Sequence, residues 1–312
     1  MCGLDRWREI GTYRYRRSDL APGAPTLTAY ERLRLRVLFE VWLPDADDVA
    51  LRAVICSRCG FVAYLPRPDS RDLAAKYEFL LEHEEQPGNE LETAIMADRG
   101  RGKRTYEAIA TRAPRVPGRV LDYGGAEGRL LSPFLDAGWE CDLVDYVAES
   151  LPGVNRLGAT LSDVPTGRGY DAIICSHVLE HLAEPGATLL ELRPFLAEGA
   201  VLFAEVPVDL WGGLPIARDP VTHVNFFTAL TLEQLLARNG YRVLDRVAMT
   251  GSYAGTVKDV TFAVATPGGD GAPDGRPAVA EAEALLKPAL RRRLGRLWRH
   301  RARLLNRFYP GF

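Results

Sequence analysis

The hydrophobic residues in the middle of the chain fall in short runs, separated by stretches long enough for a helix. The clearest runs are residues 119–122, 140–145, 170–175, 200–205, 241–244 and 259–264. Short apolar strands that alternate with helical segments are typical of βαβ units, in which helices cover both faces of a largely parallel sheet. The pattern therefore predicts a doubly wound α/β domain over residues 113–265.

The segments on either side of this domain follow other patterns. Residues 1–70 mix arginine-rich and apolar stretches and end in turn-forming prolines, which predicts a small N-terminal module. Residues 71–112 show helical spacing interrupted by Gln86-Pro87-Gly88-Asn89, and are predicted to be connecting helices. A stretch rich in glycine and proline follows the α/β domain, so residues 266–280 are predicted to be a flexible linker.

The C-terminal residues 281–312 predict a basic amphipathic helix, because leucines recur every three or four residues with arginines between them. Residues 286–312 include nine basic residues and no acid; since the whole chain carries −2, the rest of it carries −11. Such a helix can bind an anionic membrane, a partner protein or the chain's own acidic body, and these alternatives stay open. Nucleic acid is not an expected partner, because no aromatic-rich basic groove accompanies the helix.

Composition excludes several classes of protein. With 312 residues, 47% hydrophobic and 26% charged, the chain is typical of an ordinary globular protein. No apolar run is long enough to cross a membrane, and residues 1–6 lack the apolar stretch of a secretory signal. Five cysteines, an odd number, argue against a secreted disulfide framework. We therefore expect a cytoplasmic protein, peripheral at the membrane if the basic helix binds lipid; the oligomeric state cannot be read.

The segment 120–130 is predicted to be a strand that enters a glycine-rich turn and continues as a helix. Such a turn lets a ligand approach the backbone at the carboxyl end of the strand. The spacing lacks the last glycine of a dinucleotide fingerprint. Asp122 would repel a pyrophosphate but suits a ligand that carries an ammonium and a sulfonium group, which predicts S-adenosylmethionine. The predicted contacts in this segment are Asp122, Tyr123, Gly124, Gly125 and Gly128.

Further acids lie near the ends of the next predicted strands. Asp145, followed by Tyr146, ends the second strand, where a carboxylate can accept hydrogen bonds from ribose hydroxyls. Ser162 and Asp163 precede the third core strand, where the acid can reach an adenine amino group. Taken alone, Asp163 is more simply a solvated loop carboxylate or a helix cap. Three acids at three strand ends nevertheless favour the ligand.

In this order, the segments resemble the class I S-adenosylmethionine-dependent methyltransferases. The resemblance covers about half of the chain and rests on the glycine loop, on Val178-Leu179-Glu180-His181-Leu182 after the fourth strand, and on residues 222–228 and 232–241. It implies a Rossmann-like, seven-stranded sheet and methyl transfer to oxygen, nitrogen or carbon of a small metabolite or sugar-containing intermediate, as in secondary metabolism. It also implies cofactor contacts from Asp122, Gly124, Gly128, Asp145 and Asp163. Ala126 stands where the family usually has a middle glycine.

The histidines are the candidates for acceptor chemistry. Methyl transfer is an in-line displacement, which needs a base only if the acceptor carries a proton. His177 follows the fourth strand, and its backbone is expected to line the methionine end of the cofactor; His181 either contributes to catalysis or holds the loop. In similar sugar-modifying and natural-product methyltransferases a histidine often faces the acceptor where His223 lies, so the resemblance implies a base there, or else a residue that orders the loop. Thr222 stands where those relatives often have an acid, which argues against a metal- or acid-assisted variant.

The run Cys56-Ser57-Arg58-Cys59-Gly60 has the form of half a zinc knuckle, because a tight turn that ends in glycine lets both thiolates face one ion. Relatives that resemble this region carry two knuckles, and Cys2-Gly3 is similar to the end of the first one without its leading cysteine. Either the start of the chain lies a few residues late, or three thiols remain with His83 as the fourth candidate ligand. The alternative is a metal-free module in which Cys56 and Cys59 pack.

In either case the N-terminal module, with Tyr64 and Tyr77, is expected to act as a lid that covers the cofactor cleft and shapes the acceptor site. Two other functions are weighed. One is a scaffold protein that binds S-adenosylmethionine without turnover. The other is a nicotinamide-dependent oxidoreductase, which the missing glycine and Asp122 disfavour.

Overall fold

The computed structural model describes residues 6–21, 27–83, 90–147, 149–210, 213–217, 219–253, 256–269 and 271–287. The strands are β1 (Trp7–Arg16), β2 (Asp48–Cys56), β3 (Val62–Leu65), β4 (Arg119–Tyr123), β5 (Glu140–Val144), β6 (Asn155–Gly158), β7 (Tyr170–Ser176), β8 (Leu196–Pro207), β9 (Asn225–Phe226), β10 (Tyr241–Tyr253) and β11 (Thr256–Pro267). The α-helices are α1 (Ala29–Arg36), α2 (Ser70–His83), α3 (Glu90–Ala110), α4 (Ser132–Asp136), α5 (Pro185–Leu192), α6 (Ala229–Arg238) and α7 (Arg276–Leu286).

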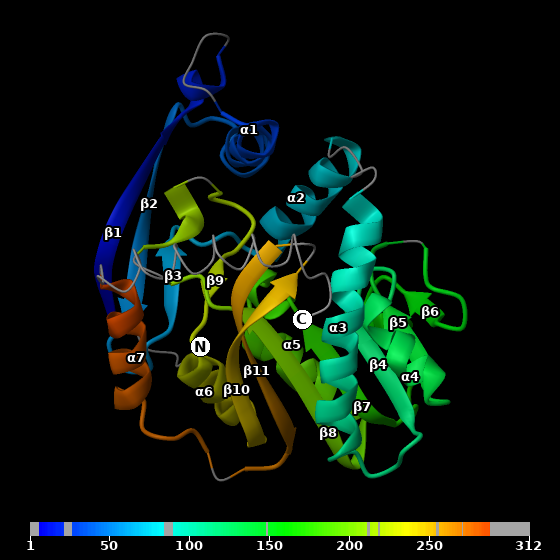
Figure 1. Cartoon of the computed structure of the whole chain (residues 1–312). Helices are drawn as coiled ribbons and strands as arrows, with labels where there is room; N and C mark the ends of the chain where they lie inside the picture. Colours follow the sequence, from blue (N-terminus) through cyan, green and yellow to red (C-terminus); the bar gives the residue numbers. More distant parts are fainter. Residues whose placement is uncertain are drawn as a thin grey trace, which may run out of the picture.

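The main sheet contains seven strands within the described residues, in the order β10-β11-β8-β7-β4-β5-β6 (Figure 1). The strands from β8 to β6 pair in parallel, whereas β11 pairs antiparallel with both β8 and β10. The chain runs outward from β4 through β5 to β6 and then returns to β7 beside β4, so the strand order reverses there. Open α/β sheets bind ligands outside the carboxyl ends of the strands at such a point. The prediction of a Rossmann-like, seven-stranded sheet is confirmed.

Both faces of this sheet are buried, which explains the nearly continuous apolar runs of its central strands. Ile173 and Cys175 of β7 belong to a hydrophobic cluster with α5 and α6, whereas the alternate residues Ala172 and Ile174 pack with residues of α3 and α4. Figure 1 shows α3 crossing one face of the sheet. Helices therefore cover both faces of the sheet and pack against its central strands.

Strand β6 has no counterpart among the apolar runs of the sequence. Its four residues, Asn155 to Gly158, are exposed or half-buried, and the strand pairs only with β5 at the edge of the sheet. An edge strand this short buries too little side-chain area to need a hydrophobic pattern.

The N-terminal residues form a second, antiparallel sheet, which has the order β1-β2-β3-β9 within the described residues. Strand β9 comes from the segment after β8, and Val62 and Ala63 of β3 pair with it. The core beneath this sheet also takes residues from that segment, including Leu210, Ile216 and Phe226. The module predicted over residues 1–70 is therefore built together with residues that lie far along the chain.

The segment predicted to be a linker is partly regular. Residues 266–267 end β11, and α7 begins at Arg276, five positions before the predicted helix, so the irregular stretch is shorter than expected. Helix α7 lies beside β1 and β2 in Figure 1, and Glu283 pairs with Arg8. Gly60 lies under this helix: its φ is +73°, and a Cβ there would lie 2.4 Å from the Ala278 carbonyl oxygen. The turn that follows Cys59 is therefore a docking surface for α7.

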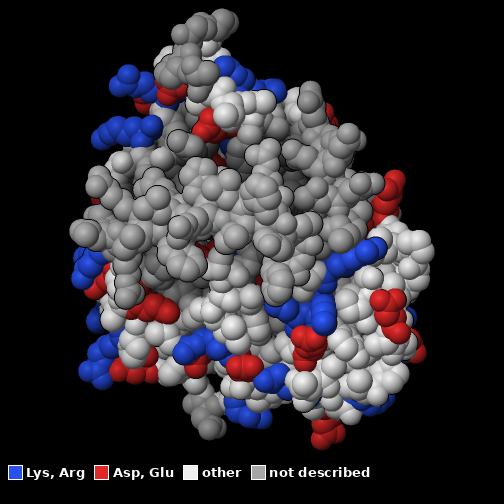
Figure 2. Space-filling view, viewed as in Figure 1, with Lys and Arg blue, Asp and Glu red and all other residues white. Residues whose placement is uncertain are grey.

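Residues 288–312, which hold most of the predicted basic helix, lie outside the described residues. On the face seen in Figure 2, acidic and basic side chains of the described residues are interspersed. None of the helices in the described ranges is long and apolar enough to cross a membrane.

Candidate functional site

A cavity of about 490 Å³ lies at the carboxyl ends of β4, β5 and β7, where the strand order reverses. The ends of the three strands contribute Tyr123, Gly124, Asp145, Tyr146 and His177 to its wall. Helix α2 contributes Ser70, Leu73, Ala74, Tyr77 and Leu81 from the other side. His181 also lines the cavity, so the structure brings six of the predicted site residues together around it.

The glycine loop needs its small residues for two different reasons. Gly124 has φ +72°, and a Cβ there would lie 2.6 Å from Val178 Cγ2, so both backbone conformation and space require glycine. Gly128 also has a positive φ of +78°. Ala126 adopts φ +52° in spite of its Cβ, and its N–H donates to Asp145 Oδ2 at 2.8 Å. The loop is therefore held by the acid at the end of the neighbouring strand.

Asp145 accepts two backbone hydrogen bonds in the part of the cavity wall that follows β5. Its Oδ1 accepts the Val147 N–H at 2.8 Å while Oδ2 accepts that of Ala126. Each carboxylate oxygen has a second lone pair, so a ligand hydroxyl can still bind. Tyr146, 61% exposed, stacks against Tyr77 of α2 with 6.1 Å between ring centroids. The two rings place an aromatic surface on this side of the cavity.

Asp122 is the most unusual group near the cavity. Its side chain is buried beneath the glycine loop, and neither carboxylate oxygen has a hydrogen-bond partner among the described residues. A Cβ on Gly125 would lie 2.2 Å from Asp122 Oδ2, so this glycine leaves room for the acid. Burial raises the pKa of Asp122 to about 7, and the negative charge of Asp145 adds to the increase. An unpaired buried carboxylate is costly, and a cation from a ligand would offset that cost.

Ser162 and Asp163 do not line the cavity, although the neighbouring Ala159 and Thr160 do. Asp163 Oδ2 accepts the N–H groups of Ala159 and Thr160, both at 2.9 Å, and caps a short 3-10 turn, Leu161–Asp163. These hydrogen bonds lower the pKa of Asp163 below its ordinary value. The geometry matches the helix cap, the simpler of the two interpretations of this residue.

His177 joins the cavity to a buried polar network that the sequence did not predict. It adopts φ +57°, and its Nδ1 lies 3.2 Å from Glu180 Oε1. Its Nε2 lies 3.6 Å from Glu205 Oε1, at the end of β8. Arg101 of α3 donates to Ser176 Oγ at 2.9 Å and to Glu205 Oε1 at 3.2 Å. Among Arg101, Ser176 and Glu205, only Glu205 could have been singled out in the sequence, because it is the acid that ends the apolar run 200–205.

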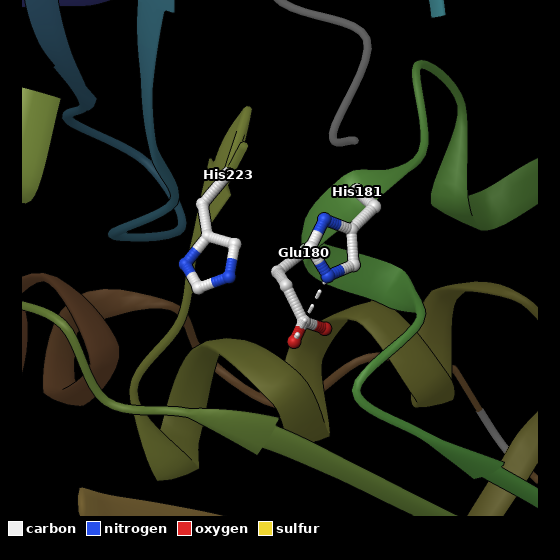
Figure 3. A group of neighbouring side chains, drawn as sticks. All are labelled: Glu180, His181 and His223. Carbon is white, nitrogen blue, oxygen red and sulfur yellow. Dashed lines mark ion pairs between the residues drawn. The ribbon is translucent and has the colours of Figure 1, made fainter. Parts of the chain in front are cut away.

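His181 and His223 come together through backbone contacts between two distant segments. The Val224 N–H donates to the Glu180 carbonyl at 2.9 Å, and Asn225 Nδ2 donates to the carbonyls of Leu179 and Leu182. The two imidazole rings meet edge to face with 4.8 Å between centroids. Both rings border the carboxylate of Glu180, as Figure 3 shows. Of the three, only His181 lines the cavity.

Hydrogen bonds orient both imidazoles in the same way. His181 Nδ1 lies 2.8 Å from the Thr222 carbonyl oxygen, so Nδ1–H donates there and Nε2 keeps its lone pair. His223 Nδ1 lies 2.8 Å from Asp209 Oδ2 and donates to it. Asp209 is a site residue missed in the sequence, because its fourteen-residue separation from His223 gives no local signal. The acid absent at Thr222 is thus supplied from elsewhere in the chain.

Burial and nearby charges shift the pKa values of His181, His223 and Glu180 in opposite directions. Burial lowers the pKa of His181 to about 3, so this imidazole is neutral at pH 7. Burial also lowers the pKa of His223, but the hydrogen bond to Asp209 and the charges of Glu180 and Asp209 raise it above its ordinary value. Burial raises the pKa of Glu180, yet the surrounding imidazoles lower it overall, so Glu180 is a carboxylate.

The predicted zinc knuckle is not supported. Cys56 and Cys59 are buried and belong to the hydrophobic cluster on the α5 and α6 side of the sheet. Within the described ranges, no third His, Cys, Asp or Glu stands close enough to complete a metal site with them. His83 stacks on Phe79 at the exposed end of α2, and Cys2 lies outside the described residues. Tyr64 is fully buried and does not line the cavity, unlike Tyr77.

A comparison with protein families assigns the chain to one of them. Residues 69–246 match the protein family described as "Methyltransferase domain", more than half of the chain, and the chain belongs to this family. The prediction of a methyltransferase is confirmed. The match favours methyl transfer over the nicotinamide-dependent alternative.

Among solved structures, the chain is similar to the 1,6-didemethyltoxoflavin-N1-methyltransferase of Burkholderia thailandensis with bound 1,6-didemethyltoxoflavin and S-adenosylhomocysteine (TM-score 0.49, 20% identity, 66% of this chain and 96% of that one). It is also similar to the magnesium protoporphyrin IX methyltransferase of Synechocystis PCC 6803 (0.44, 16%, 58% and 89%). A third is the glycopeptide N-methyltransferase MtfA in complex with S-adenosyl-L-methionine (0.42, 19%, 54% and 87%). No curated protein matches the chain in sequence.

Proposed function

We propose that this protein is a class I S-adenosylmethionine-dependent methyltransferase that acts on a small metabolite or a sugar-containing intermediate. The observation that carries the proposal is Asp122, a carboxylate buried beneath the glycine loop without a partner among the described residues. In a methyltransferase-family chain, the ammonium group of S-adenosylmethionine is the cation that this position suits. Asp145 then accepts the ribose hydroxyls, and Tyr146 and Tyr77 pack near the adenosine.

The acceptor binds in this proposal on the histidine side of the cavity, between the carboxyl end of β7 and the N-terminal module. His223 receives the acceptor's proton at Nε2, because Asp209 holds Nδ1–H and stabilises the imidazolium that forms. His181 borders both the cavity and His223. Helix α2 and the sheet β1-β2-β3-β9 act as the lid that shapes the acceptor site.

The test is ligand-dependent thermal unfolding of the whole chain with S-adenosylmethionine, S-adenosylhomocysteine or NAD. A ligand at about 100 times its Kd adds roughly 2.7 kcal/mol, which is a shift of several degrees. Only the two methionine derivatives should raise the midpoint, and Asp122→Asn should abolish the shift. The matched control is Asp136→Asn, which changes an exposed acid on α4. Stabilisation by NAD, or an unchanged response in Asp122→Asn, would refute the proposal; binding without turnover on a broad acceptor panel would favour the scaffold protein.

A further inference from the structure

Glu180, His181 and His223 form a cluster with the chemistry of a metal centre. One ligand atom from each lies within 4.8 Å of the others, and the described residues hold no other such group of three. His181 Nε2 lies 3.7 Å from Glu180 Oε1 (Figure 3). Ligand atoms about 2.1 Å from one tetrahedral ion lie roughly 3.4 Å apart, so small side-chain rotations bring these atoms to coordination distance.

The hydrogen bonds around the cluster provide a second, independent observation. Metal-bound histidines usually donate their other ring N–H to a carbonyl or a carboxylate, which fixes the tautomer and directs the lone pair at the ion. His181 donates to the Thr222 carbonyl and His223 donates to Asp209, both at 2.8 Å. Both rings therefore keep Nε2 available on the side of Glu180.

Glu180 is the third observation. The side chain is completely buried, and among the described residues its carboxylate receives no backbone N–H. The nearest ring nitrogens are those of His177, at 3.2 Å, and His181, at 3.7 Å. A buried carboxylate is usually paired with a cation or bound to a metal. A divalent ion beside Glu180 would meet this requirement.

We propose that Glu180, His181 and His223 bind one divalent transition-metal ion, with Asp209 as the positioning residue for His223. Two imidazoles and one carboxylate suit Zn²⁺, Co²⁺ and similar ions, and leave at least one coordination position open. Binding of the ion does not depend on the proposed function; its role does. On the acceptor side of the cavity, the open position would take an acceptor oxygen and lower the pKa of its hydroxyl. His223 is then a ligand, and it is a base only when the ion is absent.

The test is titration of the chelator-treated full chain with Co²⁺ and Zn²⁺, followed by visible absorption and calorimetry. One equivalent of Co²⁺ should give visible d–d bands. Glu180→Gln, His181→Ala and His223→Ala should each weaken binding by at least about tenfold, and Asp209→Asn by roughly tenfold, as for groups that orient ligands. His83→Ala and Cys59→Ala are matched controls that should leave the bands and the affinity unchanged. Circular dichroism confirms that each variant is folded.

Absence of Co²⁺ bands, binding that survives both histidine substitutions, or binding abolished by Cys59→Ala would overturn the metal site. S-adenosylmethionine binding is measured on the same samples. If Co²⁺ binds while S-adenosylmethionine does not, the proposed function fails and the metal site stands. If S-adenosylmethionine binds and supports turnover that chelation does not change, the metal proposal fails in its catalytic role and His223 remains the base.

Discussion

The two walls of the cavity are built in different ways. The cofactor wall comes largely from one stretch, residues 120–147, in which two adjacent parallel strands end side by side. The acceptor wall combines α2 with the turn after β7, which lie far apart in sequence, and His223 packs against His181 of that turn without lining the cavity. The first wall follows from the geometry of consecutive βαβ units. The second wall depends on the pairing of β3 with β9, which no local sequence pattern predicts.

The walls also differ in their charge. Asp122 lies under the cofactor wall without a hydrogen-bond partner among the described residues, and in the proposed function the ligand supplies a cation for it. On the acceptor side, Asp209 and Glu180 lie against imidazoles. In the proposed function, one wall recognises a fixed positive charge, whereas the other moves a proton or holds an ion. The substitutions below separate these two roles.

The largest effect is expected on the acceptor side. His223→Gln should lower kcat by about 100- to 1,000-fold, because removal of a base or of a group that activates the acceptor costs this much. The Kd of S-adenosylmethionine should change less than about twofold, since His223 does not line the cofactor wall. Single-turnover transfer of a labelled methyl group to an acceptor found by screening measures the first, and calorimetry the second; His83→Gln is the control. A variant with normal kcat but weak cofactor binding would reverse the assignment of the walls.

The next largest effect is expected for Asp122→Asn, which should weaken cofactor binding but stabilise the ligand-free protein. Loss of the charge should weaken S-adenosylmethionine binding by about 100-fold, as expected for a buried charge pair that loses one partner. In wild type the affinity should rise as the pH increases through the pKa of about 7, because only the ionised carboxylate pairs with the ammonium. Calorimetry between pH 6 and pH 8 tests both points. A pH dependence that persists in the variant would contradict them.

The same substitution should stabilise the ligand-free protein. The folded pKa of Asp122 is raised from 3.8 to about 7, so folding favours the neutral acid, and stability is lost as the pH rises from about 4 to about 7. The full cost is up to about 4 kcal/mol at pH 8, since one pKa unit is about 1.4 kcal/mol. Asp122→Asn should recover part of it at pH 8 and little at pH 4. Urea unfolding at the two pH values measures the difference, and equal stabilisation at both would exclude ionisation as its cause.

Glycine substitutions should have a smaller effect, confined to the cofactor wall. Gly124→Ala should cost about 2 to 4 kcal/mol of stability, because a left-handed backbone and a clash with Val178 add up. Gly138→Ala is the control: it has a similar φ of +80° with nothing within 4 Å of the new Cβ, so it should cost only about 1 to 2 kcal/mol. The double variant Gly124→Ala, Val178→Ala should recover part of the difference in thermal unfolding. No recovery would mean that conformation alone requires the glycine.

The smallest effect is expected at Asp163. Because its carboxylate caps a turn outside the cavity, Asp163→Asn should change the Kd of S-adenosylmethionine by less than about threefold. Asp145→Asn, at a residue that lines the cavity, is the comparison and should weaken binding more. A loss at Asp163 as large as that at Asp145 would support the contact with adenine predicted from the sequence.

The sequence alone determined the α/β class, the methyltransferase family and most of the cofactor wall. These are local properties: apolar runs with helical segments between them, glycines at a turn, and acids at strand ends that a parallel sheet aligns on one edge. It did not predict β6, which buries too little to need an apolar pattern, and it favoured an adenine contact for Asp163, which the structure uses as a cap.

Only the tertiary structure decided the acceptor wall. Asp209 and His223 are fourteen residues apart, and Arg101 meets Glu205 across more than a hundred residues, so their contacts follow from packing and not from spacing. The same holds for Cys56 and Cys59, whose spacing is typical of a zinc knuckle but whose turn receives α7 in the fold. Strand ends in a parallel sheet are placed by local connectivity. Side chains from separate segments are placed by the pairing of β3 with β9 and by the core beneath it, because only these contacts bring the segments together.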